Sequence, residues 1–73
     1  MKIPFQPHAQ ARYPFDKMRR GDFFDVPQDV KPYGVVASVV SQRMKRERGA
    51  VYWVSTVITA DKRKVTRVTR RSI

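Results

Sequence analysis

The side chains in this sequence that could do chemistry are cations and aromatic rings, not catalytic groups. His8 is the only histidine, and no second ligand or carboxylate lies near it in the sequence, so metal or acid–base chemistry is not expected. The aspartates of residues 16–29 lack the spacing of a calcium loop, and there is no Ser/His/Asp set or glycine-rich phosphate motif. We therefore expect no enzymatic activity, metal, cofactor or small-molecule substrate.

The charge of the chain is strongly positive and unevenly distributed. The chain has 73 residues, with 16 Lys and Arg against 6 Asp and Glu, for a net charge of +10. Residues 32–73 hold ten basic and two acidic side chains, net +8, whereas residues 1–31 hold six and four, net +2. Such a field attracts anionic partners. The sequence therefore places the electrostatic face in its C-terminal half.

Two basic clusters make up most of that face. The first, at the end of a predicted helix, comprises Arg43, Lys45, Arg46 and Arg48. The second, in a predicted hairpin, comprises Arg63, Lys64, Arg67, Arg70 and Arg71. Cations in a last helical turn also compensate the helix dipole, so the first cluster alone is compatible with a solvated helix end. Two patches close in space would produce a stronger field than either alone and favour phosphate or acidic-protein contacts.

Aromatic residues interleave with these cations. Strand alternation assigns Phe24 and Tyr52 to a core, and it turns Phe23 and Trp53 toward the opposite faces of their strands. Aromatic rings on a basic sheet can stack nucleic-acid bases. We therefore regard Phe23 and Trp53 as candidates for a partner surface.

One helix is predicted over residues 33–48. Val36, Val40 and Met44 recur at i, i+4 and i+8 and form one apolar stripe. Pro32 suits the helix start, and Gly49 can adopt the left-handed conformation that closes a helix. Because valine has weak helix propensity, the segment should depend on packing its stripe against a sheet.

Three strands are predicted to form that sheet, at residues 22–26, 51–59 and 64–70. The last two are joined by a polar connection and read as a C-terminal β-hairpin. Val65 and Val68 are out of phase, which predicts either a bulge or a strand with both sides partly covered. The fold class is therefore α+β, with the helix on one face of a small antiparallel sheet. The predicted core comprises Phe15, Met18, Phe24, Val26, Val36, Val40, Met44, Tyr52, Val54, Ile58 and Val68.

The rest of the chain fits one small intracellular domain. Residues 1–12 are proline-rich and predict an extended, flexible arm, and residues 13–73 predict a single compact domain with a frayed basic C-terminus. There is no cysteine, so nothing argues for secretion. No apolar run approaches the roughly 18 residues that a membrane span needs, so we expect no membrane association.

A family resemblance rests on residues 13–18 (YPFDKM) and 21–27 (GDFFDVP). They resemble a family of small phage proteins with a YPF-x-x-M-x-x-GD-x-F pattern, followed by a helix, a short basic stretch with Gly and a terminal hairpin. The likeness covers roughly residues 13–70, and the length and basic tail are similar to those of an RNA-polymerase-binding transcription regulator of a lytic phage. It implies a protein of the host bacterial cytoplasm that binds the N-terminal segment of the polymerase β′ subunit, inhibits initiation by displacing σ and suppresses termination.

A candidate partner surface combines this implied partner with the residue pattern. Its predicted apolar centre comprises Phe23, Val35, Val39 and Trp53, and its basic rim comprises Arg43, Arg46, Arg67 and Arg70. Nucleic acid could lie near that rim within the transcription complex. The alternative is a basic nucleic-acid-binding phage protein that acts through helix 33–48 and the hairpin. A winged helix would need two further supporting helices, and residues 1–31 do not predict them.

Overall fold

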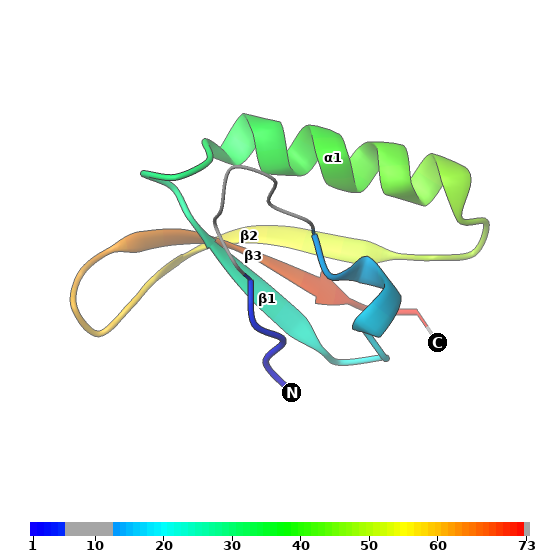
Figure 1. The fold of residues 1–73 in the computed structure, drawn as a ribbon, viewed down its shortest axis with the longest axis horizontal. Coiled ribbons are helices and arrows are strands. Elements are labelled where there is room, and N and C mark those ends of the chain that lie inside the picture. Colours follow the sequence, from blue (N-terminus) through cyan, green and yellow to red (C-terminus); the bar gives the residue numbers. More distant parts are fainter. Residues whose placement is uncertain (6–12, 73) are drawn as a thin grey trace.

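The computed structural model describes residues 1–5 and 13–72 and has the predicted α+β architecture (Figure 1). Its elements, in chain order, are the 3₁₀ turn η1 (Phe15–Lys17), strand β1 (Phe23–Pro27), helix α1 (Tyr33–Arg46), strand β2 (Tyr52–Ile58) and strand β3 (Lys64–Arg70). The predicted strands and helix are confirmed to within one or two residues at each end. The short turn η1 was not predicted.

The three strands form one antiparallel sheet in the order β1-β3-β2. The last strand of the chain is therefore the central one, with Phe24 and Val54 both opposite Val68. The register is continuous, so no bulge separates Val65 from Val68. Val65 is buried, and strand alternation places it on the face opposite to that of Val68, which confirms the second of the two expectations, a strand partly covered on both sides.

Helix α1 covers one face of this sheet (Figure 1). Val36 and Val40 point from it into the core and are fully buried, as the helical stripe predicted. The helix ends at Arg46, two residues earlier than expected, because Glu47 leaves helical geometry. Gly49, with φ of 83°, then makes the left-handed turn toward β2.

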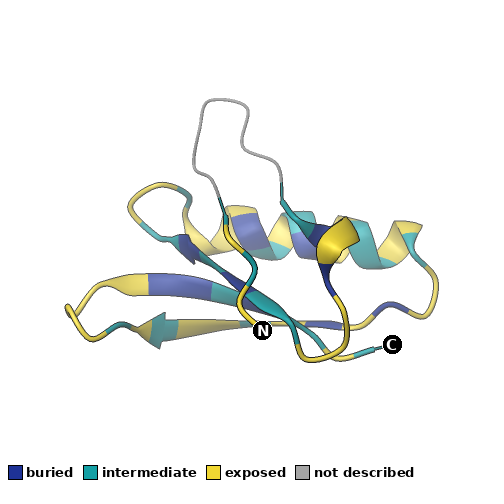
Figure 2. Cartoon of the chain, turned by 60° about the horizontal axis from the view of Figure 1, so that its bottom comes forward, coloured by how far each residue is buried: buried dark blue, intermediate teal, exposed yellow. Residues whose placement is uncertain are grey.

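Aromatic rings fill the space between η1, α1 and the sheet. The ring centroids of Phe15 and Phe24 lie 5.7 Å apart, and those of Phe15 and Tyr52 lie 5.2 Å apart, both edge to face. Buried residues lie in η1, in α1 and in all three strands (Figure 2). The predicted core residues that are buried are Phe15, Met18, Phe24, Val26, Val36, Val40, Tyr52 and Val68.

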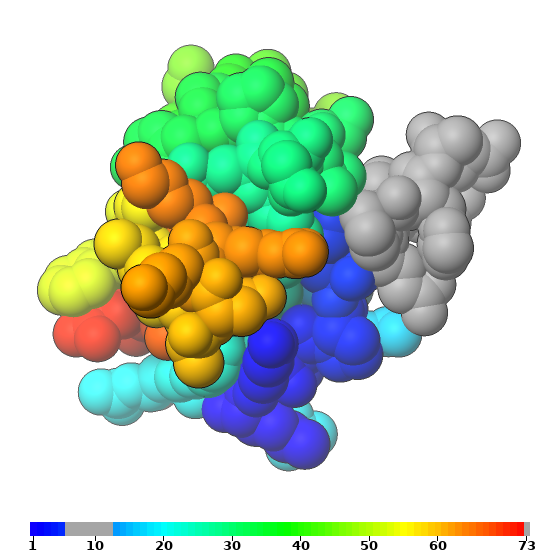
Figure 3. All heavy atoms as spheres, turned by 90° about the vertical axis from the view of Figure 1, so that its left-hand side faces the viewer, coloured from blue at the N-terminus to red at the C-terminus, as the bar shows by residue number. Residues whose placement is uncertain are grey.

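Three predicted core positions differ. Met44 and Val54 are only half-buried at the margin of the core. Ile58 is wrong as a core residue, since 65% of it is exposed. Ile58 is on the same side of β2 as Tyr52 and Val54, as strand alternation predicted. However, the hairpin tip projects beyond the end of α1 (Figures 1 and 3), so the helix does not cover Ile58. The sequence also missed Ala50 and Thr66, both of which are buried.

Residues 1–5 of the expected arm lie against β1 in the structure. Lys2 forms a parallel bridge with Phe23, and the Ile3 N–H donates to the Phe23 carbonyl at 2.7 Å. The Phe5 ring stacks on Phe24 with centroids 6.1 Å apart. Pairing satisfies backbone groups at the β1 edge and covers apolar surface, which offsets the cost of ordering the segment. The remainder of the expected arm, residues 6–12 with His8, lies outside the described residues.

In the described ranges, no helix combines the length and apolarity needed to cross a membrane.

Candidate partner-binding surfaces

The face of the sheet opposite α1, here called the open face, carries three cross-strand rows of side chains. Strand register places Phe23, Thr69 and Trp53 in one row. The next rows contain Asp25, Arg67 and Ser55, then Pro27, Val65 and Val57. No described element packs over this face as α1 packs over the other. The sequence prediction that Phe23 and Trp53 point away from the core is therefore correct, and the register adds that they share a row.

Each of the two aromatic rings on the open face carries an arginine. The guanidinium carbon of Arg67 lies 4.3 Å from the centroid of Phe23, and that of Arg71 lies 4.0 Å from the centroid of Trp53. These are cation–π distances. Trp53 nevertheless remains 59% exposed. The result is two cation–π pairs on the sheet face opposite α1.

Asp25 fixes the first stack in place. Its carboxylate accepts from Nε and a terminal nitrogen of Arg67 at 2.8 and 3.1 Å, and Lys2 Nζ lies 3.8 Å away. The hydrogen bonds to Asp25 raise the pKa of the Arg67 guanidinium. Bidentate pairing sets the plane of a guanidinium as well as its position. Asp25 thus holds the Arg67 guanidinium over the Phe23 ring.

The predicted apolar centre is divided between two sides of the molecule. Phe23 and Trp53 belong to the open face, whereas Val35 and Val39 belong to α1, which covers the other face. Val35 is 44% exposed and Val39 packs half-buried against the core. The structure therefore does not bring these four residues into one patch, because they belong to elements whose relative placement the sequence did not determine.

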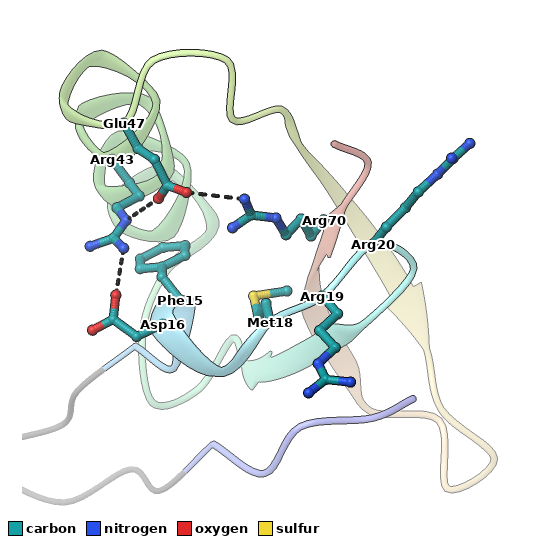
Figure 4. A pocket seen from close by; sticks show the side chains of 8 residues that line it. All are labelled: Phe15, Asp16, Met18, Arg19, Arg20, Arg43, Glu47 and Arg70. Carbon is teal, nitrogen blue, oxygen red and sulfur yellow. Dashed lines mark hydrogen bonds and ion pairs between the residues drawn. The ribbon is translucent and has the colours of Figure 1, made fainter. Parts of the chain in front are cut away.

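The predicted basic rim is divided as well. Arg67 lies on the open face, and Arg46 is exposed on α1. Arg43 and Arg70 instead meet at Glu47 on the helix side of the sheet (Figure 4). Two of the four predicted rim residues therefore belong to an internal ion-pair network.

This network, here called the clasp, joins four elements of the chain. Arg43 contacts Asp16 at 2.6 Å and Glu47 at 2.9 Å. Arg70 donates to Glu47 at 3.0 Å and to the Tyr52 hydroxyl at 2.8 Å. Together these contacts connect η1 and the end of α1 to β2 and β3. The spacing of Arg43 and Glu47 could have been read as an i, i+4 pair, but the contacts to Asp16 and Arg70 are long-range.

Two opposing influences act on the pKa of Glu47 within the clasp. Burial alone raises this pKa, but hydrogen bonds and charge from Arg70 and Arg43 lower it further than burial raises it. The net pKa lies below the ordinary value. Glu47 is therefore an ionised structural carboxylate and not a candidate general acid.

A cleft of about 450 Å³ lies beside the clasp (Figure 4). It is lined by Phe15, Asp16, Met18, Arg19, Arg20, Arg43, Glu47 and Arg70. Its two carboxylates already pair with Arg43 and Arg70. The side chains of Arg19 and Arg20 extend outward and do not converge on its centre (Figure 4). The cleft therefore lacks the convergent cations of an anion site.

The outer edge of β2 is a further candidate surface that sequence reasoning missed. No described strand pairs with this side of β2. The Thr59 N–H donates to the Arg63 carbonyl, and the Arg71 N–H donates to the Val51 carbonyl. The backbone groups of the odd-numbered residues of β2 therefore face β3. The backbone groups that consequently point to the free edge belong to Tyr52, Val54, Thr56 and Ile58. Such an edge can pair with an extended segment of another chain.

Comparison with protein-family models, curated proteins and solved structures finds no significant match to this chain. Nor do the residues that the structure describes include a group of three or more potential metal ligands.

Proposed function

We propose that the chain is a non-enzymatic phage regulator that binds the host RNA polymerase through the N-terminal segment of its β′ subunit. In this proposal it acts in the host bacterial cytoplasm, inhibits initiation by displacing σ and suppresses termination. The partner comes from the resemblance of residues 13–70 to the phage family. The free edge of β2 supports the choice of surface.

The observation that carries the proposed docking mode is the free edge of β2. A chain of 73 residues is too small to block a multisubunit enzyme by bulk, so it must control a contact of peptide size. β2 offers seven residues for main-chain pairing with an extended segment. Val51, Trp53 and Ile58, all exposed, add apolar contacts along it. A polymerase segment paired in this way would be held in one conformation and withdrawn from other partners.

The partner is tested by capturing purified host polymerase on the immobilised protein, with and without the first residues of β′, after nuclease treatment. Binding should survive nuclease and disappear with the truncated subunit. Unchanged capture of the truncated enzyme would place the site elsewhere on the polymerase. Loss of capture after nuclease alone would mean that the protein holds nucleic acid instead.

The docking mode is tested separately by Thr56→Pro. This change removes an N–H that points to the free edge, and proline is tolerated in edge strands. Thr56→Val is the matched control, because it removes the same hydroxyl but keeps the N–H. We expect polymerase binding to fall in the proline variant only. Circular dichroism checks that both variants are folded. Equal binding by the two folded variants would overturn strand addition at β2.

A further inference from the structure

The open face carries an inference that goes beyond the proposed polymerase contact. We propose that it binds single-stranded nucleic acid, with bases stacking on the Phe23–Arg67 and Trp53–Arg71 pairs and phosphates contacting the surrounding cations. This surface uses side chains of the sheet face, whereas strand addition uses backbone groups of the β2 edge. The two sites share the Trp53 side chain, but Phe23 and Arg71 belong to the open face alone and the Thr56 N–H belongs to the β2 edge alone, so variants at these positions separate the two.

The spacing of the two stacks supports this assignment. Phe23 and Trp53 lie in one row on either side of Thr69. Neighbouring strands are about 4.8 Å apart, so the two strand positions are separated by about 10 Å. One flexible strand can place nearby bases on both stacks. Thr69 lies between them with a hydroxyl suited to a base edge or a phosphate.

The arginines extend the stacking surface. Bases stack on guanidinium planes as well as on aromatic rings. Asp25 holds Arg67 over Phe23, so this plane is ordered before any ligand arrives. Arg71 is exposed above Trp53 and can share the ring with a base or move aside to a phosphate. Stacking of this kind tolerates any base and predicts little sequence preference.

The charge of the face also matches a nucleic-acid strand. The face has three cations, namely Arg67 and Arg71 in the two stacks and Lys2 beside Asp25. Among the described side chains of the three rows, Asp25 is the only carboxylate. That carboxylate is already paired with Arg67 and Lys2. A duplex would keep its bases paired and unable to stack here. The combination of flat rings and excess cations therefore favours an unpaired strand over a duplex.

Trp53 is the only tryptophan in the chain, so its fluorescence reports on the site directly. The full chain, without polymerase, is titrated with an oligothymidylate of about 12 nucleotides, within the usual range for single-strand-binding folds. We expect saturable quenching that is weaker with a duplex of the same length. The salt slope should be about −2 if three phosphates are contacted, at roughly −0.7 per phosphate. Absence of quenching at low salt, or equal binding of the duplex, would overturn the proposal.

Two variants with the same change in charge separate stacking from general attraction. Arg71→Ala removes a cation on the open face, and Arg46→Ala removes an exposed cation on α1. We expect Arg71→Ala to weaken binding at least several-fold more than Arg46→Ala. Phe23→Ala should weaken it roughly 5- to 150-fold, the range for loss of one stacked base, and circular dichroism checks its fold. Equal effects of the two arginine changes would show charge attraction alone.

The remaining alternative is that the open face binds an acidic protein segment. It is tested by titrating the chain with an acidic peptide of the same length as the oligonucleotide. If it quenches Trp53 and binds as tightly as the oligonucleotide, the open face is a protein-binding surface and the assignment is wrong. Because the titration contains no polymerase, its failure leaves the capture experiment on β′ unaffected. Conversely, loss of the β′ contact would not change the quenching.

Discussion

At the scale of single residues, ion pairing assigns different roles to arginines that look alike in the sequence. Arg43 and Arg70 are committed to the clasp around Glu47. Arg67 is held by Asp25 over Phe23. Arg46 is exposed on α1. Changing each of these residues should therefore affect a different property, either stability, nucleic-acid stacking or long-range attraction.

Trp53→Ala should weaken polymerase capture by about 2 kcal/mol or more, because large exposed aromatics near the centre of an interface dominate binding energy. Arg46→Ala should cost less than about 1 kcal/mol, since a rim charge mainly affects association rate. Binding of both variants to purified polymerase, measured by biolayer interferometry, checks this. An effect of Arg46→Ala that equals or exceeds that of Trp53→Ala would exclude Trp53 as the anchor.

Glu47→Gln should destabilise the fold by about 1–3 kcal/mol, the usual cost of losing hydrogen bonds to charged groups. The neutral amide no longer balances Arg43 and Arg70, which are themselves partly buried. Asp16→Asn is the control, because Asp16 is 87% exposed and exposed ion pairs contribute little. Urea unfolding of both variants measures the difference. Similar unfolding midpoints for the two variants would show that the clasp contributes no more than a surface ion pair.

At the scale of elements, the clasp and the central strand determine how the pieces hold together. Helix α1 packs its valine stripe on the sheet, and Glu47 anchors its C-terminal end to Arg70 of β3. β3 is hydrogen-bonded on both sides, whereas β2 pairs on one side only among the described strands. Local stability should follow this arrangement.

Amide exchange should be slowest in β3 and should alternate along β2. The N–H groups of Val54 and Thr56 face the free edge, so they should exchange faster than those of Trp53 and Ser55, which face β3. Amides in the middle of α1 should be protected as well. Uniform protection along β2 would indicate that its edge is covered, for example by a second copy. Fast exchange throughout α1 would contradict the packing of the helix on the sheet.

The stability of the clasp should depend on pH in a defined direction. The folded pKa of Glu47 lies below its ordinary value of 4.5, so the folded state binds this proton less readily than the unfolded state. The contribution of Glu47 to the free energy of unfolding is therefore fully present above about pH 4.5, and it is lost as the pH falls through the lower pKa that Glu47 has in the folded state. Thermal unfolding across this acidic range should show a smaller loss for Glu47→Gln than for the native chain. An identical loss in both would exclude Glu47 as a source of the acid sensitivity.

At the scale of the whole molecule, the net charge of +10 acts on folding and on binding at once. It attracts anionic partners, but the like charges also repel one another in the folded state and destabilise it. The clasp adds nothing to this net charge, because Asp16 and Glu47 balance Arg43 and Arg70. The open face does add to it, because Lys2, Arg67 and Arg71 outnumber Asp25 there.

Moderate salt should therefore raise the melting temperature while it weakens nucleic-acid binding. Screening relieves repulsion among sixteen basic side chains, and the same screening reduces the gain from phosphate contacts. Differential scanning fluorimetry and the Trp53 titration, performed in the same salt series, measure the two effects together. A melting temperature that falls with salt would mean that ion pairs such as the clasp outweigh the net repulsion.

Local patterns in the sequence determined the elements. The valine stripe of residues 36–44 determined one helix, and the β-branched run of residues 51–59 determined a strand that turns back into a basic partner. Alternation also determined that Phe24 faces the core and Phe23 faces away. These properties depend on residues within a few positions of one another, so the sequence alone could predict them.

Only the tertiary structure decided which elements became neighbours. The placement of β3 between β1 and β2 brought Phe23 and Trp53 into one row and left the edge of β2 free. The position of α1 separated Val35 from that row, and its end at Arg46 allowed Glu47 to meet Arg70. These contacts join residues far apart in the chain, and many strand orders satisfy the same hydrophobic pattern. Composition and periodicity therefore identified the candidate side chains, and the packing of the elements decided which of them share a surface.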